Sequence, residues 1–193
     1  ADLDRIPAEA VESFAGVGFH IDLADIRAED EILDLGSGSG MDSFVAALNN
    51  DSGHVAGLDM TDAQLAKAER LRARAKFDRV SFHKGYIETP PFKADSFDVV
   101  ISNGVINLAP DKGQVFREAA RVLRRGGRLA ISDIVTEKPL PEGVTCNATL
   151  WAACIGGAMQ LDDYVAAIAA AGLRVREVRE NPAAAAERGI RAA

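Results

Sequence analysis

Short apolar runs alternate with helix-like segments along most of this 193-residue chain. Several of the runs are apolar at consecutive positions, which is typical of strands that are buried on both faces of a parallel sheet. The six runs that we interpret as strands cover residues 31–35, 54–58, 79–83, 96–102, 128–134 and 173–178. The alternation therefore predicts an α/β fold, with a mostly parallel sheet and helices on both of its faces.

The segments between these runs predict helices at residues 8–17, 41–48, 61–76, 110–126, 145–155 and 162–171. Thr61 and Gln64 match a capping box at the start of the third helix. Gly126 and Gly127 predict the end of the fourth. Residues 181–193 are rich in alanine, which favours helix over strand, so a seventh, antiparallel strand is doubtful in this chain.

Composition excludes several classes of function. The formal charge of −7 disfavours a nucleic-acid partner, because contacts to phosphates supply much of that affinity. We find no apolar stretch long enough to span a bilayer and no basic, apolar leader, so we expect no membrane association. The chain has two cysteines, Cys146 and Cys154, which predicts a reducing, cytoplasmic setting without a disulfide framework. The three histidines lack the spacing of metal ligands, so we predict no metal site.

The stretch ILDLGSGSGMDSF, residues 32–44, places a glycine loop after a buried strand. The dinucleotide fingerprint needs a third glycine where this chain has Met41. Asp34 would oppose a pyrophosphate by about 1–4 kcal/mol at ~4 Å, and it would favour a cation. S-adenosylmethionine carries an ammonium and a sulfonium but no phosphate. We therefore predict that this ligand is bound by a first set of residues: Asp34, Gly36, Ser37, Gly38 and Gly40.

Further candidates follow later strands, because ligands of such folds bind at the carboxyl ends of the strands. Asp59 is placed to accept hydrogen bonds from both ribose hydroxyls, and the other candidates for cofactor contacts are Met60, Ile87, Glu88 and Asn103. Each has a structural alternative. The glycines can form only a tight turn, and Asp59 can be an acid at a helix N-terminus. Glu88 can be solvated surface, and Asn103, like Asn107, can satisfy loop backbone.

Five blocks of sequence resemble S-adenosylmethionine-dependent methyltransferases of the Rossmann-like class, and among these the arsenite methyltransferases. The blocks are ILDLGSGSGMDSF, GHVAGLDMT, GYIE, VVISNGVINLAPDKGQVFREAARVLRRGGRL and LWAACIGGA. The resemblance covers residues 8–178, and its most specific parts are SNGVINLAPDK and LWAACIGGA. It implies a single methyltransferase domain over residues 1–193. We divide this domain into an N-terminal helical cap (1–30), a cofactor-binding core (31–135), substrate-side helices with a last strand (136–180) and a tail (181–193).

The resemblance implies a small-molecule acceptor, arsenite with thiols, and a substrate-holding role for Cys154. The family usually reads Y-G-C-G where this chain has Phe14-Ala15-Gly16-Val17-Gly18, so Val17 replaces an expected cysteine. Cys146 lies about 12 Å from Cys154 along a straight helix, too far to share one arsenic atom. As an alternative, both cysteines are ordinary packing residues.

Two other functions remain open on the sequence. One is a methyltransferase for oxygen, nitrogen or carbon of another small molecule, which the valine at position 17 favours. The other is a domain that binds the cofactor without turnover. Methylation of nucleic acid is disfavoured by the charge and by the sequence Ser102-Asn103-Gly104-Val105, which replaces an Asn-Pro-Pro-aromatic block.

Overall fold

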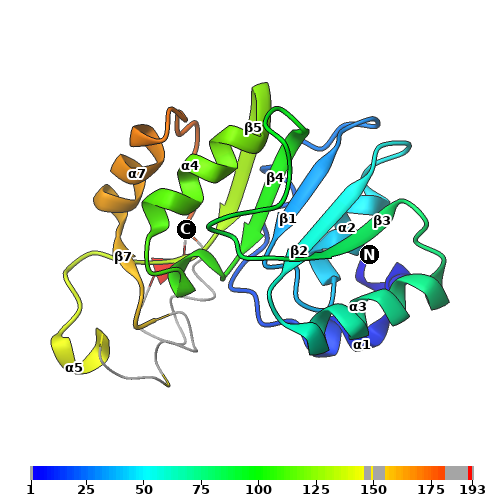
Figure 1. Ribbon diagram of the computed structural model, residues 1–193. Coiled ribbons are helices and arrows are strands. Elements are labelled where there is room, and N and C mark those ends of the chain that lie inside the picture. Colours follow the sequence, from blue (N-terminus) through cyan, green and yellow to red (C-terminus); the bar gives the residue numbers. More distant parts are fainter. Residues whose placement is uncertain (1, 146–148, 150–154, 181–190, 193) are drawn as a thin grey trace.

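The computed structural model describes residues 2–145, 149, 155–180 and 191–192. Its centre is a five-stranded sheet in the order β3-β2-β1-β4-β5 with every pairing parallel (Figure 1). The strands are β1 (Ile32–Leu35), β2 (Val55–Asp59), β3 (Val80–Lys84), β4 (Phe97–Asn103) and β5 (Leu123–Ser132). The α/β, Rossmann-like prediction is confirmed.

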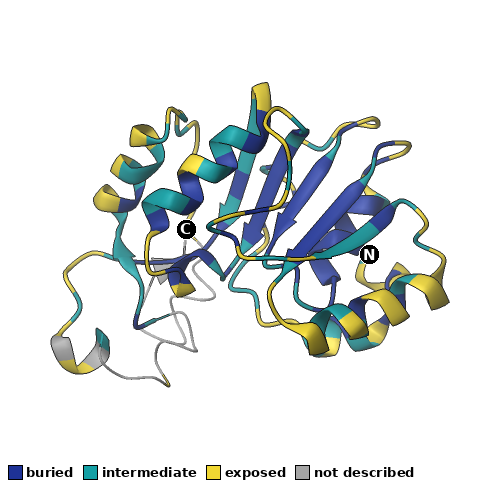
Figure 2. Cartoon of the chain, viewed as in Figure 1, coloured by how far each residue is buried: buried dark blue, intermediate teal, exposed yellow. Residues whose placement is uncertain are grey.

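The middle strand, β1, is buried along its whole length. Ile32 lies opposite Val55 on β2 and Val99 on β4. Figure 2 shows the same burial in the neighbouring strands. Because all five strands run in one direction, their carboxyl ends meet at one edge of the sheet, which we call the carboxyl edge.

Helices cover both faces of the sheet. One face is covered by α1 (Ala8–Glu12), α2 (Met41–Leu48) and α3 (Asp62–Ala75). The other face is covered by α4 (Lys112–Val122) and α7 (Leu161–Ala170). In Figure 1, α4 lies in front of the sheet and α2 behind it. The short elements are η1 (Asp2–Arg5), η2 (Ile106–Leu108) and α5 (Glu142–Thr145).

Each face of the sheet carries its own apolar cluster. On β1, Ile32 packs with Phe44 of α2, whereas the next residue, Leu33, packs with Phe116 of α4. This division follows from the pleat, which sends successive side chains to opposite faces. It explains why the strand sequences are apolar at consecutive positions.

A three-stranded sheet adjoins this core: β7 (Met159–Gln160), β6 (Ile134–Thr136) and β8 (Arg191–Ala192). β6 pairs in parallel with β7 and antiparallel with β8. The described part of the tail therefore does contain a short antiparallel strand, although its composition favoured none.

Residues 173–178 form no regular secondary structure, so the predicted sixth strand is wrong. A strand needs a neighbour with which to exchange main-chain hydrogen bonds, and residues 173–178 pair with no described strand. Alternation of apolar and charged residues does not reveal whether such a neighbour exists.

Two predicted helix ends and one predicted cap also need correction. The first helix ends at Glu12, and the fourth ends at Val122 because β5 begins at Leu123. Gly126 has a φ of +81° and lies in β5, where the pairing of β4 with β5 is irregular. It is therefore part of a strand and is not a helix cap. Thr61 is the N-cap of α3, but its side chain makes no capping hydrogen bond. Most of the predicted helix 145–155, with Cys146, Trp151 and Cys154, lies outside the described residues.

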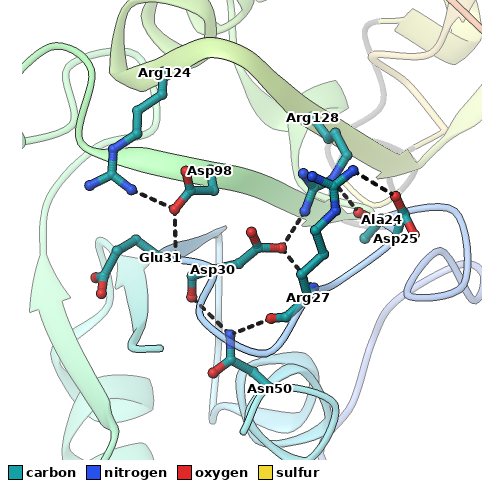
Figure 3. A network of polar contacts seen from close by, with 9 residues as sticks. All are labelled: Ala24, Asp25, Arg27, Asp30, Glu31, Asn50, Asp98, Arg124 and Arg128. Carbon is teal, nitrogen blue, oxygen red and sulfur yellow. Dashed lines mark hydrogen bonds and ion pairs between the residues drawn. The ribbon is translucent and has the colours of Figure 1, made fainter. Parts of the chain in front are cut away.

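A polar network holds the amino edge of the sheet (Figure 3). Asp30, just before β1, accepts a hydrogen bond from the backbone N–H of Arg27 and pairs with the guanidinium of Arg128 on β5. Asn50, after α2, donates to the carbonyl oxygens of Arg27 and Asp30 at 3.1 and 2.8 Å. The network joins the segment before β1 to β5 and to the residue after α2. In the described part of the chain, we find no helix with both the length and the apolar character that crossing a membrane requires.

Candidate functional site

Residues 36–40 form a glycine loop that joins β1 to α2 at the carboxyl edge. Gly36, Gly38 and Gly40 all have positive φ values, of 75°, 52° and 94°. The N–H groups of Gly36 and Ser37 both donate to the carbonyl oxygen of Leu58, at 2.8 and 3.0 Å. The loop is thus anchored to the end of β2, and Gly40 becomes the N-cap of α2.

Gly38 is the open point of this loop. A Cβ atom built on Gly38 would meet nothing within 4 Å, whereas one on Gly36 would lie 2.6 Å from Cγ2 of Val105. A ligand can therefore approach the main chain at Gly38 but not at Gly36. The side chain of Ser37 is buried, and its hydroxyl has no partner among the described residues.

Asp59, the last residue of β2, binds the loop directly. Its Oδ2 accepts a hydrogen bond from the Gly38 N–H at 2.9 Å, and its Oδ1 accepts one from the Thr61 N–H at 2.8 Å. A carboxylate oxygen can accept a second bond, so the half-buried Asp59 retains capacity for ligand hydroxyls. The structure brings the glycine loop and Asp59 together, as the sequence predicted, and adds a role in shaping the loop.

Asp34 lies beneath the loop and is buried. Its Oδ2 accepts a hydrogen bond of 2.6 Å from the hydroxyl of Ser43 on α2. Burial, with the neighbouring carboxylates Asp42 and Asp59, raises the pKa of Asp34 to about 8, against the opposing effect of the Ser43 hydrogen bond. Asp34 is therefore mostly protonated at neutral pH in the unliganded protein, and it supports the loop through Ser43. A cation bound at this edge would favour its ionised form.

We expect Asp34→Asn to change how stability depends on pH. Because the folded-state pKa is raised, the stabilisation from protonated Asp34 is complete below its unfolded pKa of about 4 and is lost as pH rises through about 8. The unfolding free energy of the unliganded wild type should fall by at least about 1 kcal/mol between about pH 6.5 and 9, and the variant should lack this fall. Denaturant unfolding across the pH range measures both, with exposed Asp51→Asn as control. Equal slopes for wild type and Asp34→Asn would contradict this assignment.

Asp42 is a candidate residue of this edge that the sequence analysis missed. It lies in the first turn of α2 and is buried, and its Oδ2 accepts a hydrogen bond of 2.9 Å from the amide of Asn103. Burial raises the pKa of Asp42 to about 6, although the Asn103 hydrogen bond lowers it. An acid in the first turn after a glycine loop was a visible signal, but helix N-termini often carry acids for reasons of the helix dipole alone.

The segment before residue 20 lies against the same edge. Val17 donates its N–H to Oδ1 of Asn103 at 2.8 Å. A Cβ built on Gly104 would lie 3.4 Å from Cγ1 of Val17. The hydroxyl oxygens of Ser13 and Ser39 are 2.6 Å apart, which links this segment to the glycine loop as well. Position 17 therefore lies beside the end of β4.

The remaining predicted residues differ in exposure. Met60 is 62% exposed immediately after Asp59, and Glu88 is half-buried, with its carbonyl accepting from Gln114 at 3.3 Å. Ile87 is buried in the apolar cluster on the α4 face. Met60 and Glu88 remain accessible for cofactor contacts, and Ile87 is primarily a packing residue.

Asn107 belongs to a separate network. Its amide donates to Oδ1 of Asp133 at 2.7 Å and to the carbonyl oxygen of Ile134 at 2.6 Å. Asp133 also accepts from the hydroxyl of Tyr164 on α7 at 3.2 Å. Burial raises the pKa of Asp133 to about 6. Asn107 therefore supports the backbone of η2 and β6, as in the structural alternative that the sequence analysis gave for this residue.

Within the described ranges, no group of three or more acidic, histidine or cysteine side chains is arranged to hold a metal.

Comparison with known proteins points to one family. The family model described as a methyltransferase domain matches residues 26–176. An arsenite methyltransferase of Halobacterium salinarum is 40% identical over 172 residues, which cover 89% of this chain and 44% of that protein. The chain thus spans less than half the length of this curated relative.

Two other matches cover most of the chain. The 27-O-demethylrifamycin SV methyltransferase of Amycolatopsis mediterranei is 36% identical, covering 90% of this chain and 62% of that protein. The crystal structure of an arsenic(III) S-adenosylmethionine methyltransferase from Chlamydomonas reinhardtii matches with a TM-score of 0.83 and 36% identity. That match covers 99% of this chain and 69% of the other.

Proposed function

This chain belongs to the methyltransferase domain family, and we propose that it transfers a methyl group from S-adenosylmethionine to trivalent arsenic. The observation that carries the proposal is the combination of a glycine loop, anchored by Asp59 at the carboxyl edge, with similarity to arsenite methyltransferases over most of the chain.

The residues at the edge fit S-adenosylmethionine. Gly38 offers open space for a ligand next to the main chain, and Asp59 has free capacity to accept hydroxyl hydrogens. Asp59 places a carboxylate at the edge, and a bound cation would favour the ionised form of Asp34, so the edge favours a cation over a phosphate. When bound, the cofactor supplies a methyl group that is already activated on a sulfonium. We propose that Ser37, Gly38 and Met60, with Glu88, complete its binding site, while Gly36 and Gly40 give the loop its shape.

Positioning is the main task left to the protein. A methyl transfer from a sulfonium leaves a neutral thioether, so it needs no acid–base pair to stabilise a leaving group. Correct placement of donor and acceptor can contribute effective molarities of about 10⁵ M or more. The glycine loop and Asp59 orient the donor side. The segment around Val17 and the end of β4 form part of the acceptor side.

The acceptor proposal rests on the sequence blocks shared with arsenite methyltransferases. Arsenic(III) is soft and prefers thiolate ligands. Cys154 lies outside the described residues, and we propose that it supplies one protein thiolate while small thiols supply the others. The low cysteine content and the charge of −7 support a reducing, cytoplasmic setting and a small-molecule acceptor in place of nucleic acid.

A second acceptor class is favoured by Val17. This apolar side chain stands where the arsenite methyltransferases usually have a cysteine, and it lies at the end of β4. The similarity to the 27-O-demethylrifamycin SV methyltransferase over 90% of the chain supports the same alternative. An apolar small molecule with a reactive hydroxyl is therefore the alternative acceptor.

One experiment tests donor and acceptor together. The protein is incubated with S-adenosylmethionine, arsenite and glutathione, and in parallel with a panel of phenolic and other hydroxylated acceptors. Methylated arsenic in the first reaction alone supports the proposal. Methylation only of a hydroxyl supports the alternative, and binding without turnover on any acceptor contradicts both.

Asp59→Ala should weaken S-adenosylmethionine binding by at least ~1.5 kcal/mol, about tenfold, because hydrogen bonds to a charged acceptor are lost. Calorimetric titration measures the affinity. The matched control is Asp62→Ala, which removes a neighbouring exposed carboxylate paired with Lys84. Unchanged affinity in a folded Asp59→Ala protein would remove this residue from the binding site.

A further inference from the structure

The side-chain amide of Asn103 uses all of its hydrogen-bonding capacity within the protein. Its Oδ1 accepts from the N–H groups of Val17 and Gly18, at 2.8 and 3.4 Å. Its Nδ2 donates to the carbonyl oxygen of Gly18 and to Oδ2 of Asp42, both at 2.9 Å. An amide has two donor hydrogens and one acceptor oxygen with two lone pairs, so this set is complete. Asn103 therefore links residues 17–18 to Asp42 of α2, and we call this set of four hydrogen bonds the clamp. These contacts leave the Asn103 amide little capacity to bind a cofactor.

The clamp works only with the amide in one orientation. If the amide were flipped, its NH₂ would face the N–H groups of Val17 and Gly18, and its oxygen would face two acceptors. Three of the four hydrogen bonds are with the backbone of residues 17–18. These three cannot fix the amide independently of the N-terminal segment, because residues 17–18 belong to that segment. Asp42 is the only partner that belongs to the sheet-covering helix α2, so it ties the amide to the rigid core.

The segment held by the clamp packs closely. A Cβ added to Gly16 would lie 2.6 Å from Cγ of Asn103, and one added to Gly104 would touch Val17. Small changes in the direction of the Asn103 side chain would therefore displace residues 16–18. These residues include position 17 on the acceptor side.

We propose that Asp42 is a positioning residue, whose carboxylate orients the Asn103 amide and through it holds residues 16–18 against the end of β4. The inference that residues 16–18 contribute to acceptor binding rests on the proposed function. The clamp itself does not, because it is a set of contacts in the protein alone. The competing role for a buried acid here is purely electrostatic attraction of the cofactor's positive charge.

Two substitutions at position 42 separate these roles. Asp42→Asn removes the charge but keeps an oxygen that can accept from Asn103, whereas Asp42→Ala removes the acceptor. Hydrogen–deuterium exchange of the Val17 and Gly18 amides should be about tenfold faster in Asp42→Ala, because one charge-assisted bond of the clamp is lost. In Asp42→Asn it should stay within about threefold of the wild type. Asp62→Ala, in the first turn of α3, is the control.

Steady-state kinetics give a second reading with whichever acceptor the wild type methylates. Asp42→Ala should raise KM for the acceptor and lower kcat, with the Kd for S-adenosylmethionine unchanged, and Asp42→Asn should restore both. Loss of cofactor affinity in both variants would overturn positioning in favour of the electrostatic role. Wild-type exchange rates in Asp42→Ala would overturn the clamp. If the wild type methylates no acceptor, the proposed function fails while the exchange data still decide the clamp.

A rescue experiment covers the case in which Asp42→Ala does not fold. Asn103→Asp sets two carboxylates against each other and should accelerate amide exchange at residues 17–18. The double variant Asp42→Asn/Asn103→Asp restores a donor between the two positions and should recover much of the protection. An absence of recovery in a folded double variant would contradict the proposal.

Discussion

Gly36→Ala is expected to destabilise the protein by about 2–5 kcal/mol, from roughly 1–2 kcal/mol for a left-handed backbone and 1–3 kcal/mol for overpacking. Gly36 has a φ of +75°, and an added Cβ would lie 2.6–2.7 Å from three side-chain atoms of Val105. Val105 is β-branched and stiff, so it cannot turn away cheaply. The loop would have to shift, and S-adenosylmethionine binding should be lost with it.

Gly38→Ala is the matched control for stability. It has the same left-handed backbone, with a φ of +52°, but an added Cβ would meet no atom within 4 Å. We therefore expect a loss of only about 1 kcal/mol, the backbone contribution alone. Urea unfolding of both variants measures the difference. Equal destabilisation would show that contact with Val105 does not hold the loop against the end of β4.

Cys154→Ser is expected to abolish arsenic methylation, with a loss of at least about 100-fold, because arsenic(III) prefers thiolate to hydroxyl ligands. Cys154 is the cysteine within LWAACIGGA, the block shared most specifically with the arsenite methyltransferases. Cys146→Ser removes the other cysteine of the chain and should leave the activity intact. Methylated arsenic, separated by chromatography and quantified by its metalloid content, gives the measurement.

The preference of arsenic(III) for thiolates also predicts that an added cysteine increases the affinity for arsenic. Val17→Cys should tighten arsenic binding, since it adds a thiolate beside the end of β4, where the Val17 N–H donates to Oδ1 of Asn103. Arsenite titration with and without glutathione measures the effect. Full arsenic methylation by Cys154→Ser, together with no tightening in Val17→Cys, would remove both positions from the arsenic site and leave Cys154 as a packing residue.

The sequence by itself determined the sheet and the position of the loop, because both depend on local patterns. Consecutive apolar residues in β1 require two covered faces, and the two apolar clusters of Ile32 and Leu33 are that result. Gly36, Gly38 and Gly40 after a buried strand require a left-handed turn at its end, which is what the backbone has. The spacing to Asp59 is also local to one β-α-β unit.

Only the tertiary structure decided how the acids and Asn103 are used. The sequence predicted Asp34 as a ligand contact. The packing of α2 on β1 instead buries it against Ser43, and this burial raises its pKa. Asp42 and Asn103 are 61 residues apart, so no periodicity relates them. The failure of residues 173–178 to form a strand has a similar cause. Burial and hydrogen-bond partners are supplied by distant segments, and a pattern within one segment does not contain them.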